Sequence, residues 1–166
     1  MFNRPRVSEL FARRYHILKS YNPRLYRIGC IAAVSDDDSG AVCEAYGIHA
    51  TYVENAPLGR KWNLAMEAAL LLEFDYALIL GDDDIMACEL LDAYCDYMNA
   101  SVPYFGVNEL YVYSPLHDAA VRFTYPESVA KLVGCGRMID RTAIEKAGWH
   151  TRAVARRNFS FAHMTM

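Results

Sequence analysis

The chain has 166 residues, 54% of them hydrophobic, and a formal net charge of −3. This length supports one domain with a sizeable core and is too short for two ordinary domains. No run reaches the roughly 18 apolar residues of a membrane-spanning helix, and the first residues lack the apolar core of a signal peptide. We therefore expect one domain, no membrane span and a cytoplasmic location.

The spacing of apolar residues predicts an alternation of helices and strands along most of the chain. Helices are expected at residues 7–20, 41–46, 61–72, 86–98 and 141–147. Strands are expected at residues 28–34, 49–53 and 76–80, with β-like segments at 104–107 and 110–113 and a glycine-opened strand at 133–139. Such alternation predicts an α/β domain with a mainly parallel central sheet over residues 1–149, followed by a basic tail at 150–166.

The net charge conceals an uneven distribution of charged residues. Residues 1–27 carry seven Lys or Arg and one acid, residues 28–130 carry three and seventeen, and residues 131–166 carry seven and two. An acidic centre favours a divalent cation as a partner, although solvated helix faces account for many of these acids equally well. The five cysteines are scattered and form no Cys-x-x-Cys pair, so neither a disulfide framework nor a zinc cluster is indicated.

A run of three aspartates follows the predicted strand at 76–80, with only Gly81 between Leu80 and Asp82. Ligands of open α/β sheets bind at the carboxyl ends of the strands. In an extended segment Asp82 and Asp84 point to the same side and face one Mn²⁺ or Mg²⁺ ion. The alternative is that Asp84 caps a helix that starts near Ile85. The residues alone leave both interpretations open.

Several segments together resemble the family 2 glycosyltransferases of the GT-A fold, a Rossmann-type domain. The resemblance extends from Asn3 to about Trp149 and rests on the order and spacing of four segments. These segments are Asn3-Arg4-Pro5, Val34-Ser35-Asp36-Asp37-Asp38-Ser39, the Asn55-Ala56-Pro57-Leu58-Gly59-Arg60-Lys61-Trp62-Asn63 stretch, and residues 76–84. The resemblance implies metal-dependent, inverting transfer of a sugar from a nucleotide diphosphate sugar to a hydroxyl acceptor.

The resemblance also implies roles for individual residues. Asp82 and Asp84 would bind the metal, and Gly136 and Arg137 would lie on the acceptor side. Contacts to the nucleotide sugar would come from Asp36, Asp37, Asn55, Gly59, Lys61, Asn63 and Asp83. On the residues alone, Lys61 is equally a surface charge at a helix start, Asn63 an exposed helix residue, and the glycines around Cys135 a tight entry into a strand.

Two departures from the family pattern change what is expected. The family has a buried strand directly before the Asn-Arg-Pro segment, so we expect a domain that lacks its first strand, and exposed sheet edges favour association into a homo-oligomer. No acid follows Trp149, and the catalytic base is unidentified among Asp140, Glu145 and His150. A truncated, non-catalytic nucleotide-binding remnant is therefore the alternative function. The arginines at the basic ends lack interleaved aromatic residues, which argues against nucleic acid as a direct partner.

Overall fold

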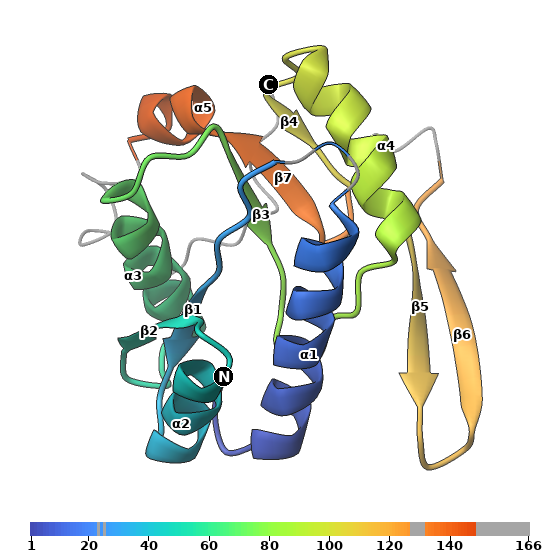
Figure 1. The fold of residues 1–166 in the computed structure, drawn as a ribbon. Helices are drawn as coiled ribbons and strands as arrows, with labels where there is room; N and C mark the ends of the chain where they lie inside the picture. The colour runs from blue at the N-terminus through green and yellow to red at the C-terminus, as the bar shows by residue number, and fades with distance from the viewer. Residues whose placement is uncertain (23, 25, 127–131, 149–166) are drawn as a thin grey trace.

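A computed structural model describes residues 1–22, 24, 26–126 and 132–148 of the chain (Figure 1). The expected basic tail at 150–166 lies outside these residues. Helices alternate with strands from α1 to β4, as the apolar pattern predicted. The helices are α1 (Pro5–Tyr21), α2 (Asp37–Ala45), α3 (Leu58–Leu70), α4 (Cys88–Asn99) and α5 (Arg141–Lys146).

The described strands form three small sheets. β1 (Ile31–Val34) pairs with β2 (His49–Tyr52) in parallel, with Ile31 opposite His49 and Val34 opposite Tyr52. β7 (Arg137–Asp140) lies between β3 (Tyr76–Ile79) and β4 (Tyr104–Phe105) and is antiparallel to both. β5 (Glu109–Ser114) and β6 (Ala119–Thr124) form an antiparallel hairpin. β6 was not predicted as a separate strand.

The predicted α/β class is confirmed, but the prediction of a mainly parallel central sheet is wrong. Among the described strands, only β1 and β2 pair in parallel, because β7 returns between β3 and β4 in the opposite direction. β1 and β3 do not pair with each other, so the central strands remain divided into two sheets.

Helices cover both faces of the three-stranded sheet, as Figure 1 shows. Successive strand residues point to opposite faces, and Met138 and Ile139 of β7 accordingly enter different core clusters. Met138 packs with α1 and α4 through residues such as Leu18 and Tyr94. Ile139 packs with α3 and α5. A third cluster joins α1 and α2 to β1.

Four of the five helices start at other residues than predicted, and local hydrogen bonding explains the largest difference, at α2. α2 begins at Asp37, four residues before the predicted start, because Asp36 caps it and allows three polar residues into its first turn. α4 begins only at Cys88, after a turn at Asp82 and Asp83. None of the helices within the described ranges is long and apolar enough to cross a membrane.

Ile144 offers a test of the core because its side chain is fully buried among β3, β7 and α3. Ile144→Ala removes apolar contacts and leaves a cavity, so we expect the free energy of unfolding to fall by about 2–5 kcal/mol. Leu116→Ala is the control, since Leu116 is 85% exposed, and its effect should stay within about 0.5 kcal/mol. Urea unfolding of both variants measures the difference, and equal effects would contradict this assignment of the core.

Candidate functional site

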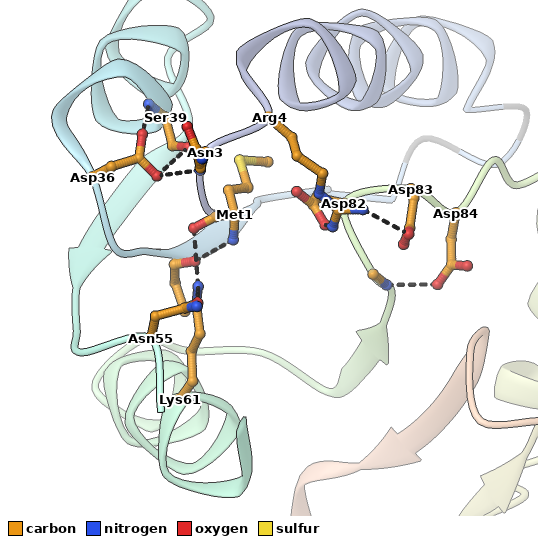
Figure 2. A network of polar contacts seen from close by, with 12 residues as sticks. Met1, Asn3, Arg4, Asp36, Ser39, Asn55, Lys61, Asp82, Asp83 and Asp84 are labelled. Carbon is orange, nitrogen blue, oxygen red and sulfur yellow. Dashed lines mark hydrogen bonds and ion pairs between the residues drawn. The ribbon is translucent and has the colours of Figure 1, made fainter. Parts of the chain in front are cut away.

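The carboxyl ends of β1 and β3 lie at the same end of the molecule, and Met1 lies between the loops that follow them (Figure 2). The loop after β1 carries Asp36, and the loop after β3 carries the three aspartates. The first turn of α3 contributes Lys61 from a third direction. The structure thus gathers several of the predicted site residues around the first four residues of the chain.

Asp36 is held in place by hydrogen bonds to both of its carboxylate oxygens. Oδ1 accepts from the Ser39 N–H at 2.8 Å, while Oδ2 accepts from the Ser39 hydroxyl at 2.9 Å and from the Asn3 N–H at 2.8 Å. Burial opposes ionisation, but the hydrogen bonds from the Ser39 and Asn3 backbone outweigh it and hold the pKa of Asp36 below its ordinary value. Asp36 therefore caps α2 and anchors the Asn3 segment to it.

Lys61 is almost completely buried, with 7% of its surface exposed. Its ammonium donates to the Met1 carbonyl at 2.9 Å and to Asn55 Oδ1 at 3.2 Å. A buried charge requires such partners, because its hydration is lost on folding. Lys61 is thus more than a surface charge at a helix start, and its hydrogen bond to Asn55 brings two of the predicted nucleotide-sugar residues together.

The aspartate run is a turn and not the extended segment that the sequence suggested. The Asp84 N–H donates to the Gly81 carbonyl at 3.2 Å, and Asp84 Oδ2 accepts from the Gly81 N–H at 2.6 Å. The premise of an extended segment with Asp82 and Asp84 on one side is therefore wrong. Asp82 points toward Arg4 (Figure 2), whereas the Asp84 carboxylate bonds back to the Gly81 N–H. The helix-cap alternative is also wrong, because the described helix begins at Cys88.

Arg4 bridges two of the three aspartates across the front of this turn. Its guanidinium lies 2.6 Å from Asp82 Oδ1 and 3.1 Å from Asp83 Oδ2. The Asp82 side chain is 11% exposed, and its second oxygen, Oδ2, is buried without a hydrogen-bond partner in the structure. A buried carboxylate oxygen without a partner is costly, so Asp82 retains unused capacity to bind a cation or a hydrogen-bond donor.

The predicted acceptor segment packs against the aspartate turn. The Gly136 N–H donates to the Ile79 carbonyl at 2.8 Å, just before the turn, and Gly136 has a φ of 71° that favours glycine. Burial and the neighbouring Asp84 carboxylate raise the pKa of the Cys135 thiol. Arg137 is 7% exposed, and its Nε donates to the Val133 carbonyl at 2.8 Å. Its guanidinium therefore braces a loop, and a role toward an acceptor stays a prediction.

Three other residues predicted to contact the nucleotide sugar, Asp37, Gly59 and Asn63, are not part of the hydrogen-bond network around Met1 and Arg4 in Figure 2. Asp37 is exposed in the first turn of α2, and Gly59 is the second residue of α3. Asn63 lies two residues beyond Lys61, which is about 200° around an α-helix, so it leaves α3 on the opposite side. Sequence reasoning missed the roles of Arg4 and Met1, because their partners lie far along the chain and no spacing rule connects them.

The carboxylates at this site determine whether Mn²⁺ or Mg²⁺ fits it. The described ranges contain no group of three or more His, Cys, Asp or Glu side chains placed to hold a metal. Mg²⁺ commonly uses one or two carboxylates and completes its shell with water and substrate phosphates. The unpartnered Oδ2 of Asp82 fits that mode as a single carboxylate, whereas Asp84 bonds back to the Gly81 N–H, so the described residues do not form a site of protein ligands alone.

Comparison of the chain with models of known protein families, with curated proteins and with solved structures gave no match. The interpretation of the site therefore rests on its residues and their geometry.

Asp36→Ala tests the capping role of Asp36. The variant removes the acceptor of three hydrogen bonds, and we expect a loss of about 1–2 kcal/mol in the free energy of unfolding at neutral pH. Because the folded pKa lies below the unfolded one, the loss should be full above about pH 4 and shrink below it. Asp38→Ala, an exposed site in the same helical turn, is the control and should show little change in urea unfolding.

The amino group of Met1 gives a second, pH-dependent test. Burial, followed by the nearby Lys61 charge, lowers the pKa of this group from 8.0 to about 6. Between these values the unfolded chain binds the proton and the folded chain does not, so stability should rise as the pH increases from 6 to 8. Urea unfolding of the chain with a free and an acetylated amino terminus measures this, and an identical pH profile for both would contradict it.

Proposed function

We propose that this chain binds a nucleotide diphosphate sugar together with Mn²⁺ or Mg²⁺ and transfers the sugar to a hydroxyl acceptor with inversion. The proposal extends the resemblance to family 2 glycosyltransferases of the GT-A fold, and it includes the Rossmann-type character of the domain. Its support is the meeting of the Asn3-Arg4, Asp36, Lys61 and Asp82–Asp84 segments at one end of the molecule (Figure 2).

One observation carries this proposal. Oδ2 of Asp82 is buried without a hydrogen-bond partner, and the positive charge beside this carboxylate is the guanidinium of Arg4. Arg4 is about half exposed, so its guanidinium can leave Asp82 and Asp83 at little cost in buried surface. The exposed Arg4–Asp83 pair contributes only about 0–1 kcal/mol, whereas Asp82 is 11% exposed and needs another positive charge in place of Arg4. A divalent cation can therefore take over the neutralisation of Asp82, and Arg4 is then available for a phosphate oxygen.

The charges around the site suit a diphosphate. Arg4 and the Lys61 ammonium are the positive side chains in the network, and a phosphate pairs well with a guanidinium through two parallel hydrogen bonds. The exposed Asp37 carboxylate, at the start of α2, would accept hydrogen bonds from the base or the ribose. Asp36 would act through the shape of the loop, because its oxygens already cap α2.

Asp82 and Asp84 would hold the metal, and Asp83 would contact the donor. When bound, a divalent cation neutralises the charge that develops on the leaving diphosphate. The acceptor hydroxyl would approach along the Gly134-Cys135-Gly136 segment, which contacts the aspartate turn through Asp84. In this proposal the protein residues bind and orient the donor, and the acceptor reaches it beside the aspartate turn.

A specific observation favours the alternative, nucleotide binding without transfer. Asp140 Oδ1 caps α5 by accepting from the Ala143 N–H at 2.5 Å and from the Thr142 hydroxyl at 2.9 Å. Glu145 Oε1 accepts from Arg141 Nε at 2.8 Å. Both acids that sequence reasoning considered as bases are therefore engaged in local contacts. His150, the third candidate, lies outside the described residues.

A thermal-shift and hydrolysis experiment tests the proposed function. We expect UDP- or GDP-sugars to raise the melting temperature of the parent only with Mn²⁺ or Mg²⁺ present, and one of them to be slowly hydrolysed. Asp82→Asn should abolish the metal-dependent shift. The control is Asp75→Asn, an exposed carboxylate just before the amino end of the same strand, which should behave like the parent.

The outcomes separate the two candidate functions. A metal-dependent shift without hydrolysis or transfer to a panel of sugar acceptors would support nucleotide binding alone. If no nucleotide sugar gives a shift, both functions are wrong. If Asp82→Asn responds as the parent does, the assignment of the metal to Asp82, and with it the proposed metal-dependent transfer, is wrong.

A further inference from the structure

The hairpin of β5 and β6 lies at one side of the molecule, beyond α1 and α4 (Figure 1). None of its residues enters the three core clusters, and no other helix or strand of the described ranges packs extensively on it. An isolated two-stranded hairpin is only marginally stable in water, and a sheet with an apolar face buries that face against another element. The faces of this hairpin therefore show whether it needs a covering partner.

The two faces of the hairpin differ in chemistry. Cross-strand partners share a face, and so do residues two positions apart along a strand. The register of the strands gives one face, called here the apolar face, that consists of Leu110, Val112, Ser114, Ala119, Val121 and Phe123. The opposite, polar face consists of Glu109, Tyr111, Tyr113, Ala120, Arg122 and Thr124. The apolar face carries no charged residue.

The polar groups of the polar face are satisfied within the hairpin. Arg122 Nε donates to Glu109 Oε2 at 2.8 Å, and the Thr124 hydroxyl donates to the same oxygen at 3.3 Å. The Tyr113 hydroxyl donates to Asp118 Oδ1 at 2.9 Å. This face is suited to water, so the face that requires a partner is the apolar one.

The apolar face is large enough for a dimer interface. Val112, Val121 and Phe123 are 57%, 66% and 44% exposed, and Leu116 at the tip of the hairpin is 85% exposed. The exposed apolar surface amounts to roughly 500 Å² in one copy, so two such surfaces in contact would bury about 1,000 Å², the lower limit for a specific interface. This size fits a dimer of moderate affinity.

Side-chain size changes along the apolar face in a way that fits the same face of a second copy. From one end to the other, the cross-strand pairs are Leu110–Phe123, Val112–Val121 and Ser114–Ala119. A two-fold axis across the middle of the hairpin reverses the strand direction, so the large pair of one copy lies over the small pair of the other. Large side chains over small ones fill the space between two sheets about 10 Å apart. Because the face is uncharged, no like charges meet.

We propose that the apolar face of the β5–β6 hairpin is the interface of a homodimer, in which the same face of a second copy of this chain covers it. The two-fold axis passes through the Val112–Val121 pairs, and the four strands form a small two-layered β-sandwich. This surface is separate from the sheet edges at which association was expected, because β6 was not predicted as a strand.

Sedimentation equilibrium of the full chain, at concentrations from about 2 to 500 µM, measures this association. We expect a monomer at the lowest concentration and a dimer, with a dissociation constant in the micromolar range, at the highest. Val121→Lys places two ammonium groups against each other at the two-fold axis, so it should raise the dissociation constant by about a hundredfold or more. Since Val121 is 66% exposed and lies outside the core clusters, this variant should keep the urea midpoint of the monomeric parent.

Ala120→Lys is the matched control. It adds the same charge one residue away, at an exposed position on the polar face, and should dimerise as the parent does. A mixture of Val121→Lys and Val121→Glu gives a second, positive test. Each variant should be monomeric alone, and the mixture should form a dimer, because opposite charges then meet at the axis.

The proposal fails if the parent stays monomeric over this range, if Ala120→Lys weakens the dimer as much as Val121→Lys, or if the mixture of the two Val121 variants remains monomeric. A monomeric parent that binds phosphatidylcholine vesicles, with the binding lost in Val121→Lys, would assign the face to a lipid surface and overturn the dimer. These results are independent of the proposed transferase function, because no nucleotide or metal is present in the measurement.

Discussion

The backbone pairing of Met1 with β1 is the contact on which the candidate site depends. The hydrogen bonds to Ala33 and from Ser35 fix the direction in which the chain leaves toward Asn3 and Arg4. Lys61 binds the same Met1 carbonyl and so connects α3 to it. The same segment then contacts both loops, since the Asn3 N–H donates to Asp36 after β1 and Arg4 pairs with Asp82 after β3. The central strands are divided into two sheets, which α1 and α3 also connect by packing on both.

Neutralisation of carboxylates is the second constraint at this end of the molecule. Asp36 is satisfied by N–H and O–H donors, Asp84 by the Gly81 N–H, and Asp82 and Asp83 by Arg4. Only a positive charge can neutralise adjacent carboxylates fully, because neutral donors leave the net charge in place. The Oδ2 atom of Asp82 is the point where this neutralisation is incomplete, and it is the reason to propose ligand binding here.

Much of the local structure could be predicted from the sequence. The periodic spacing of apolar residues predicted the helices to within a few residues. The strand predicted at 76–80 is β3, which the structure places at Tyr76–Ile79. The α2 start was predicted late because the capping by Asp36 adds a polar first turn that apolar spacing cannot reveal. β6 was missed because all of its residues are exposed, so no alternation between buried and exposed positions marks it. The aspartate run was read as extended, although Gly81 and Asp84 close it into a turn.

The sequence by itself determined the α/β class, the order of the elements and the position of acidic residues after two strands. These features follow from interactions between residues a few positions apart, and the spacing of apolar and polar residues along the chain reflects such interactions. Only the tertiary structure decided that Arg4 pairs with Asp82, 78 residues away. It also decided that Lys61 is buried against Met1, and that β7 runs antiparallel between β3 and β4. Such pairings depend on how whole elements pack, and many different pairings are compatible with the same local pattern.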